Sequence, residues 1–182
     1  MTSPPRDRTR IEIRATDWDD PAGVALREAM QAEMDNRYAD RLAELVVGPA
    51  DTRRLHGTLG IEVEQVAYVG IACADRVPVG HVALRRLGDD LELKRMYVVP
   101  PRRGSGIATA LLRTAEDAAR SLGASRIILQ TGDRQPDAVG LYEREGYSRI
   151  PVFSPYEWLS FSICMEKLLC HSFPAAPTGG RP

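Results

Sequence analysis

The chain has 182 residues, of which 43% are hydrophobic, 27% are charged and 6% are aromatic. This length and composition are typical of one globular domain with a substantial core. Twenty-four basic and twenty-five acidic side chains give a formal net charge of −1, which disfavours a general attraction to nucleic acid or to anionic membranes. Any anion-binding site must therefore be local.

The terminal residues, the lack of long apolar runs and the cysteines further restrict the class of protein that this chain can be. No apolar run approaches the roughly 20 residues that a membrane span needs, and residues 1–10 are polar, so we expect a cytoplasmic protein without a secretory signal or a membrane partner. Three cysteines without paired spacing, and three histidines that do not cluster with them, disfavour a disulfide framework and a metal site. We expect residues 1–9 and 170–182 to be flexible, which leaves residues 10–169 as a single folded domain.

The first half of the chain predicts one helix and four strands. A strand is expected over residues 10–15, followed by a helix that begins at Pro21 after an aspartate cap. A polar connection that contains glycine and proline then runs to about Gly60. Apolar and alternating runs predict three further strands, joined by tight turns as an antiparallel meander, over residues 66–74, 78–86 and 91–99.

The second half begins with a change to a helical period. Apolar residues from Ile107 to Leu122 recur along one face and predict a long amphipathic helix that ends at Gly123. The remaining elements are expected to be a strand over 126–130, a short helix over 136–145, and strands over 147–150 and 161–168. Helices that interrupt a largely antiparallel sheet, with one strand–helix–strand crossover, indicate a mixed α/β domain.

The most informative stretch is VVPPRRGSGIA at residues 98–108, where a strand passes through prolines, arginines and glycines into the long helix. The first amides of a helix have no partner within it, and they lie at the positive end of its dipole. Together with Arg102 and Arg103 they would form a site for phosphate or pyrophosphate. The simpler alternative is a turn that uses glycine only for its backbone angles.

Two well-known phosphate loops do not fit this stretch. A nucleotide P-loop needs Gly-Lys followed by Ser or Thr, whereas Gly106 is followed by Ile107 and Ala108. A dinucleotide loop needs Gly-x-Gly-x-x-Gly, whereas the third position here is Thr109. Nucleotide hydrolysis and hydride transfer are therefore disfavoured.

The pattern that remains is Arg-x-x-Gly-x-Ala, formed by Arg103, Gly106 and Ala108 after a Val-x-Pro strand end. A second block, Ala-x-x-Leu-Tyr-x-x-x-Gly-Tyr, covers residues 138–147. With these two blocks the chain resembles the GNAT superfamily of acyl-CoA-dependent N-acyltransferases over most of its length. Its run at residues 92–98 is similar to that of a loosely characterised bacterial subgroup.

The resemblance implies a fold and a cosubstrate. The fold is a mixed, mostly antiparallel twisted sheet with helices on both faces and a splayed central strand pair. The cosubstrate is acetyl-CoA, with its pyrophosphate on the glycine-rich turn and its pantetheine arm along the preceding strand, and no metal is implied. Gln135 stands where the family often has an asparagine. The residues that the resemblance places at the coenzyme are Met96, Tyr97, Val98, Arg103, Gly104, Ser105, Gly106, Ile107, Ala108, Gln135 and Tyr142.

The resemblance also suggests residues for the chemistry. A primary amine is almost entirely protonated at pH 7, so direct transfer of an acetyl group to it needs a base, and the leaving thiolate needs an acid. Glu92 is the candidate base, directly or through water, and an ion pair with a neighbouring cation is its alternative. Tyr142 is the candidate acid, and packing on the apolar side of its helix is its alternative.

The acceptor is expected to be a small amine or an amino-acid-like metabolite. A cation on the strand before the turn could hold a substrate carboxylate, and the candidate acceptor-binding residues are Lys94, Arg95, Tyr38 and Tyr156. Exposed sheet edges would also allow a homodimer. Two alternatives stay open: a non-catalytic acyl-CoA-binding or regulatory module, and an acetyltransferase that acts on a protein lysine or amino terminus.

Overall fold

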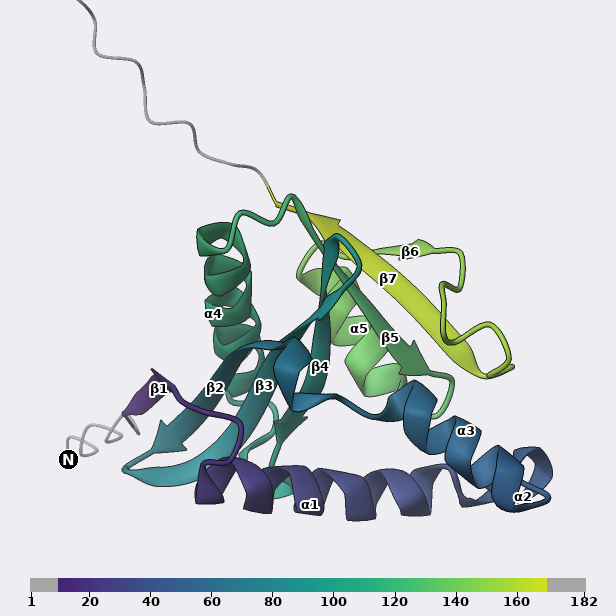
Figure 1. Cartoon of the computed structure of the whole chain (residues 1–182). Coiled ribbons are helices and arrows are strands. Elements are labelled where there is room, and N and C mark those ends of the chain that lie inside the picture. Colours follow the sequence, from purple (N-terminus) through teal and green to yellow (C-terminus); the bar gives the residue numbers. More distant parts are fainter. Residues whose placement is uncertain (1–9, 170–182) are drawn as a thin grey trace, which may run out of the picture.

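Seven strands of the computed structural model, which describes residues 10–169, form one open sheet in the order β1-β2-β3-β4-β5-β7-β6 (Figure 1). Every pair of neighbours is antiparallel except β4 and β5, so the expected mixed and mostly antiparallel sheet is confirmed. The strands are β1 (Ile11–Ala15), β2 (Val66–Ala74), β3 (Val77–Leu87), β4 (Asp90–Val98), β5 (Arg126–Gly132), β6 (Ser148–Ile150) and β7 (Ser162–Leu168).

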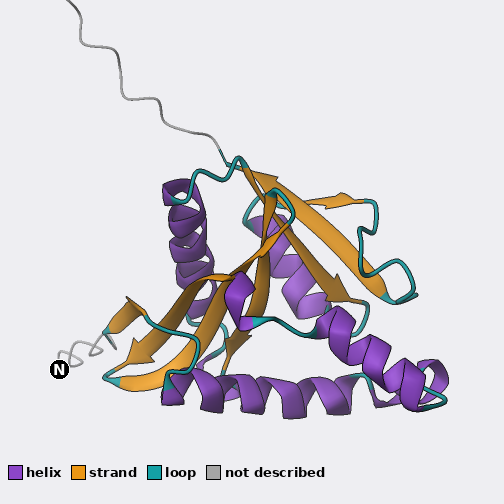
Figure 2. Cartoon of the chain, in the orientation of Figure 1, coloured by secondary structure: helices purple, strands orange, loops and turns teal. Residues whose placement is uncertain are grey.

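Helices cover both faces of this sheet, as expected (Figure 2). The first of them begins as the sequence predicts, because the Asp20 side chain accepts hydrogen bonds from the amides of Ala22 and Gly23. Short 3₁₀ turns cover Val63–Gln65 and Pro100–Arg102. The helices are α1 (Pro21–Arg37), α2 (Ala39–Leu45), α3 (Pro49–Leu59), α4 (Ile107–Ser121) and α5 (Pro136–Arg144).

The prediction that the residues up to about Gly60 form only a connection is wrong, because this stretch contains the two helices α2 and α3. Their few apolar residues, such as Leu42 and Leu55, pack into a second core around Tyr156, which lies in the loop between β6 and β7. Since that contact joins segments far apart in the chain, a local hydrophobic pattern does not reveal it.

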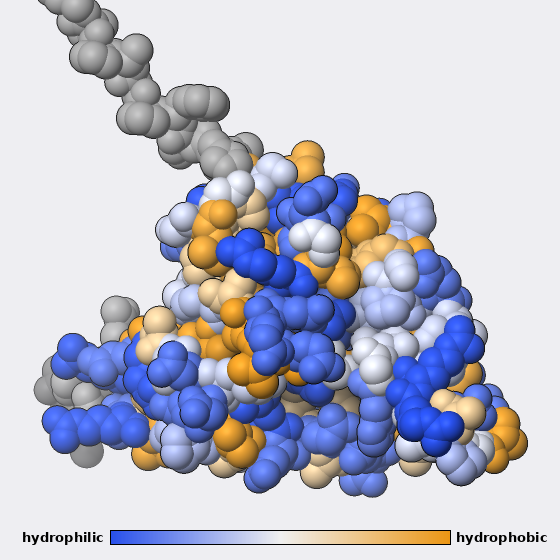
Figure 3. Space-filling view, viewed as in Figure 1, coloured by the Kyte–Doolittle hydropathy of each residue, from blue (hydrophilic) through white to orange (hydrophobic). Residues whose placement is uncertain are grey.

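The main core lies between the sheet and the apolar side of α4. The predicted stripe is confirmed, because Leu111, Leu112 and Ala115 are fully buried against strand residues such as Leu91 and Leu93. Each buried leucine contributes roughly 1.5–3 kcal/mol of transfer free energy. On the face seen in Figure 3, hydrophilic residues dominate and apolar residues form small scattered groups.

The central strand pair separates, as the resemblance implied. β4 and β5 are paired only at Leu91–Ile127, Glu92–Ile128 and Leu93–Leu129. Beyond these pairs both strands continue toward the same end of the sheet without facing each other, and α5 follows β5 on one side of the gap. The part of β4 after Leu93 therefore has a free edge on its β5 side.

Within residues 10–169 we find no helix that combines the length and the apolar character needed to cross a bilayer. The single domain predicted over residues 10–169 stays a prediction. The flexibility predicted for residues 1–9 and 170–182 lies outside the described residues.

Gly80 tests the packing of α4 on the sheet. A methyl group on Gly80 would meet Leu111 Cδ1 at 2.8 Å and the Tyr97 carbonyl oxygen at 3.1 Å, so Gly80→Ala should lower the free energy of unfolding by about 1–3 kcal/mol. Gly57→Ala is the matched control, because Gly57 lies in α3 with nothing within 4 Å of the new methyl group, and it should raise stability by about 0.5–1 kcal/mol. Urea unfolding measures both, and equal shifts would contradict the packing described.

Candidate active site

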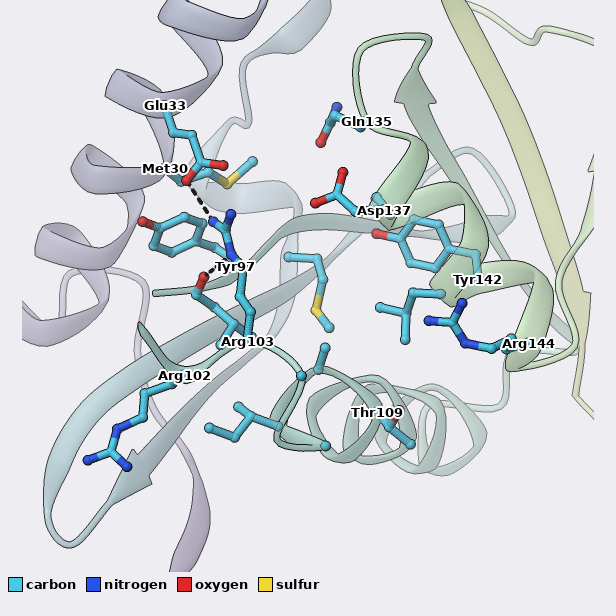
Figure 4. A pocket seen from close by; sticks show the side chains of 18 of the residues that line it. Met30, Glu33, Tyr97, Arg102, Arg103, Thr109, Gln135, Asp137, Tyr142 and Arg144 are labelled. Atoms are coloured by element: carbon cyan, nitrogen blue, oxygen red, sulfur yellow. Dashed lines mark hydrogen bonds and ion pairs between the residues drawn. The ribbon is translucent and has the colours of Figure 1, made fainter. Parts of the chain in front are cut away.

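A cavity of about 410 Å³ opens where β4 and β5 separate, and side chains from four segments converge on it (Figure 4). One wall is α1, another is the end of β4, and the others are the turn into α4 and the first turns of α5. The lining residues are Met30, Glu33, Met34, Arg37, Met96, Tyr97, Val98, Arg102, Arg103, Gly104, Gly106, Ile107, Ala108, Thr109, Gln135, Asp137, Ala138, Leu141, Tyr142 and Arg144.

The structure brings together the residues that the sequence assigned to the coenzyme. All of them line the cavity except Ser105, whose hydroxyl donates instead to the Arg102 carbonyl at 2.6 Å. The two blocks of the sequence motif, the turn before α4 and the helix α5, thus face each other across one space.

The amino end of α4 is built to present backbone amides. Gly104 and Gly106 have φ angles of 73° and 85°, in the left-handed region that glycine adopts without strain. Gly106 is the N-cap residue, no side chain caps the helix, and its first turn has no acidic residue. The first amides of α4 and the positive end of its dipole therefore border the cavity without a side-chain cap, which suits a phosphate group.

Arg103 connects the turn before α4 to α1 by hydrogen bonds. Its Nε donates to the Val98 carbonyl at 2.9 Å, and its Nη2 donates to Glu33 Oε2 at 2.6 Å, as the dashed lines in Figure 4 show. The hydrogen bond from Arg103 lowers the pKa of Glu33. Arg102 points away from the cavity centre in Figure 4.

Tyr142 lies on the α5 wall of the cavity. The residue is buried, and Figure 4 shows its hydroxyl directed into the cavity on the side of Asp137. Burial raises the pKa of the phenol, and the charge of Asp137 adds to the effect. The hydroxyl is therefore protonated at neutral pH and can donate a proton or a hydrogen bond.

Ion pairs hold the α1 and α2 segment to the far side of the cavity. Arg37 forms a pair with Asp137 at 2.9 Å, and Arg41 forms one with Asp133 at 2.5 Å. A third pair joins Arg134 to Asp40. These contacts bridge the gap that the separated strands leave, so α1 closes one side of the cavity.

Glu92 lies outside this cavity, in a buried polar cluster. Since Leu91 and Leu93 face the main core, strand alternation places Glu92 on the opposite face. Arg85 Nε donates to Glu92 Oε2 at 2.7 Å, and the Tyr156 hydroxyl donates to Oε1 at 2.5 Å. The carboxylate is fully buried, and this pairing compensates its charge.

The four candidate acceptor residues also lie outside the cavity lining. Lys94 joins the Glu92 cluster by donating to the Tyr156 hydroxyl at 2.8 Å, and burial lowers the pKa of Lys94 to about 8. Arg95 donates to the Leu59 carbonyl at 3.3 Å. The Tyr38 hydroxyl accepts a hydrogen bond from Gln135, a residue of the cavity wall, at 3.3 Å. Their roles, and that of Glu92, stay predictions.

Sequence reasoning missed most of the α1 wall and part of the α5 wall. Met30 and Met34 have the spacing of an ordinary core stripe, and Glu33 has no local mark of a binding residue. Their approach to the turn before α4 depends on the fold. Asp137 lies directly before the second motif block and Arg144 lies within it, and that position was the one signal available for them.

Comparison with known proteins gives relatives that are named as acetyltransferases. Over 93 residues the chain is 39% identical to the IAA acetyltransferase of Azospirillum brasilense, a match that covers 51% of this chain and 61% of that protein. Over 58 residues it is 41% identical to the aminoalkylphosphonate N-acetyltransferase of Salmonella typhimurium, a match that covers 32% of this chain and 38% of that protein. The matched parts thus span less than two thirds of either relative.

Solved structures agree with the fold. The chain is 25% identical to a Klebsiella pneumoniae protein assigned as an acyl-CoA N-acyltransferase, with a TM-score of 0.70 over 88% of this chain and 98% of that one. The PaiA N-acetyltransferase of Thermoplasma acidophilum, solved in complex with coenzyme A, is 19% identical, with a TM-score of 0.61 over 87% of this chain and 99% of that one. This second likeness concerns the fold alone.

The sequence profile of the Acetyltransferase (GNAT) family matches residues 26–147, which is more than half of the chain and includes both motif blocks and the α1 wall of the cavity. The resemblance inferred from the sequence is thereby confirmed. The chain belongs to the GNAT acetyltransferase family.

Proposed function

We propose that this chain transfers an acetyl group from acetyl-CoA to the primary amine of a small molecule. The observation that carries the proposal is that one cavity joins the uncapped end of α4 to the free edge of β4. The α4 amides suit the diphosphate of the coenzyme, and a free strand edge suits the amides of its pantetheine arm. The names of the relatives, and the coenzyme A in the Thermoplasma structure, support this assignment.

The side chains and backbone of the cavity fit the chemistry of the transfer. Acetyl-CoA would supply the activated acyl group. A backbone amide of residues 96–98 would stabilise the charge that develops on the acyl oxygen, because preorganised donors act strongly in a site shielded from water. Tyr142 would donate its proton to the leaving sulfur. Glu92 stays the candidate base, and it would act through water because its carboxylate does not border the cavity.

The acceptor is proposed to be small because α1 closes its side of the cavity. Met30, Glu33 and Met34 form this wall, and the Arg37–Asp137 pair holds it to α5. A polypeptide acceptor would need an open groove at this point. The wall on this side therefore supports a small amine over a protein lysine or amino terminus.

Gly106 tests the position of the diphosphate. It has a φ of 85°, Gly123 at the other end of α4 has a φ of 80°, and a methyl group added to either would meet nothing within 4 Å. Both alanine variants should lose similar stability, about 1 kcal/mol. We expect Gly106→Ala to weaken acetyl-CoA binding at least about tenfold in isothermal titration, because the methyl group would occupy space needed by a phosphate, and Gly123→Ala to leave it unchanged. Equal affinities in the two variants would contradict the assigned position.

Tyr142 has a matched control in Tyr147. The two rings are 5.6 Å apart, both residues are buried, and only Tyr142 lines the cavity. Tyr142→Phe should lower kcat by about 10²-fold with little change in the acetyl-CoA dissociation constant, because it removes a proton donor and keeps the ring. Tyr147→Phe should keep the wild-type kcat. A Tyr142→Phe enzyme with wild-type turnover would remove the acid role.

The activity itself is tested by mass spectrometry of a panel of amines and peptides incubated with the protein and acetyl-CoA. We expect a small amine to gain one acetyl group while free coenzyme A accumulates. Binding of acetyl-CoA without transfer to any amine would identify a non-catalytic module instead. Transfer to peptides alone would identify a protein acetyltransferase.

A further inference from the structure

The free edge of β4 begins at an irregularity in the strand. In the pairing of β3 with β4, His81 lies opposite Tyr97 and Ala83 lies opposite Lys94. Two residues of β4, Arg95 and Met96, therefore occupy the space opposite Val82 alone, which is a β-bulge. Arg95 has a φ of 55°, a left-handed conformation that a residue with a side chain adopts only when its surroundings hold it there.

The bulge decides which residues of β4 face the α4 side of the sheet. Before it, Leu91 and Leu93 face the main core, and after it Met96 and Val98 face that same side. If Arg95 had a regular strand conformation, the alternation of the strand would turn Met96 and Val98 to the opposite face. The part of β4 that lines the cavity thus depends on the conformation of Arg95.

A histidine of the neighbouring strand holds the bulge. His81 is fully buried, and its Nδ1 lies 2.9 Å from the Arg95 carbonyl oxygen. Its Nε2 lies 3.1 Å from Arg27 Nη1. A guanidinium only donates hydrogen bonds, so Nε2 accepts, the ring proton is on Nδ1, and Nδ1 donates to the Arg95 carbonyl.

Arg27 is itself fixed in place, so the tautomer is fixed too. Its Nη2 donates to the Trp18 carbonyl at 2.6 Å, and its guanidinium lies 3.8 Å from the centre of the Trp18 ring. Burial lowers the pKa of His81 to about 4, and the charges of Arg27 and Arg95 act in the same direction. The ring is therefore neutral at pH 7, as its two hydrogen bonds require.

We propose that His81 is a positioning residue for the acyl-pantetheine arm: by binding the Arg95 carbonyl it holds the bulge that aims the Met96–Val98 backbone at the cavity. This inference rests on the proposed function, since the arm belongs to acetyl-CoA. His81 lies outside the cavity lining and is bonded to β4 at the Arg95 carbonyl and to α1 at Arg27. Among the described residues its hydrogen bonds go to Arg95 and Arg27 and not to the α4 turn that would hold the diphosphate, so the two halves of the coenzyme should depend on it differently.

Three variants of His81 test whether it affects binding of the acyl-pantetheine arm and leaves binding of the diphosphate unchanged. His81→Asn keeps an N–H group near the position of Nδ1, whereas His81→Gln places its amide near Nε2, and His81→Leu has no polar group. The probes are acetyl-CoA and adenosine diphosphate, which carries a diphosphate but no arm. We expect the Leu and Gln variants to bind acetyl-CoA about tenfold more weakly, the loss of roughly one hydrogen bond, and the Asn variant to stay within about threefold of wild type. Adenosine diphosphate should bind all of them as it binds wild type.

Several outcomes would overturn the proposal. Equal weakening for both probes would show a merely structural role, and an Asn variant as weak as the Leu variant would exclude the hydrogen bond as the cause. Wild-type affinity of the Leu variant for acetyl-CoA would remove the role of His81 while leaving the proposed function intact. Failure of the wild-type protein to bind acetyl-CoA would instead remove the proposed function.

If the His81 variants do not fold, two measurements that leave His81 in place still test the proposal. The nitrogen chemical shifts of the His81 ring in ¹⁵N-labelled wild-type protein should show the proton on Nδ1. Arg27→Met, on the partly exposed side of α1, should reduce that tautomer and weaken acetyl-CoA binding but not adenosine diphosphate binding. A wild-type ring protonated on Nε2, or an Arg27→Met protein with unchanged acetyl-CoA affinity, would contradict the inference.

Discussion

The structure depends on the separation of β4 from β5 after three residue pairs. Backbone amides and carbonyls in a sheet normally find partners, so a strand that leaves its neighbour offers polar groups to something else. From the end of β4 the turn at residues 99–106 leads into α4, whose uncapped amides lie at the same end of the sheet. The proposed diphosphate site and the strand edge therefore adjoin because one segment of chain forms both.

The charged residues around the gap have two different tasks. On the α1 side, Glu33 and Arg37 form ion pairs with the turn before α4 and with α5, and they close the cavity. On the opposite side of β4 from the main core, Glu92 and Arg85 form a buried pair that compensates its own charge. The first group borders the space where acyl transfer is proposed, while the second packs on the other face of β4 and does not border that space.

The sequence revealed what is encoded locally and missed what depends on contacts across the fold. The stripe of α4 and the glycines of its turn act within a few residues, so the helix and the turn before it could both be predicted. By contrast, α2 and α3 are stabilised by packing of residues such as Leu55 around Tyr156, and the bulge at Arg95 depends on His81 of another strand. The α1 wall escaped prediction for the same reason, since Glu33 meets Arg103 only after folding.

The central claim is that coenzyme A lies along the free edge of β4 with its diphosphate on the amides at the start of α4. Backbone amide shifts in ¹⁵N-labelled protein, recorded as acetyl-CoA is added, test it most directly. The account predicts that the largest changes fall on residues 96–98 and 104–108 together. Saturable binding that leaves both groups of amides unchanged would contradict it.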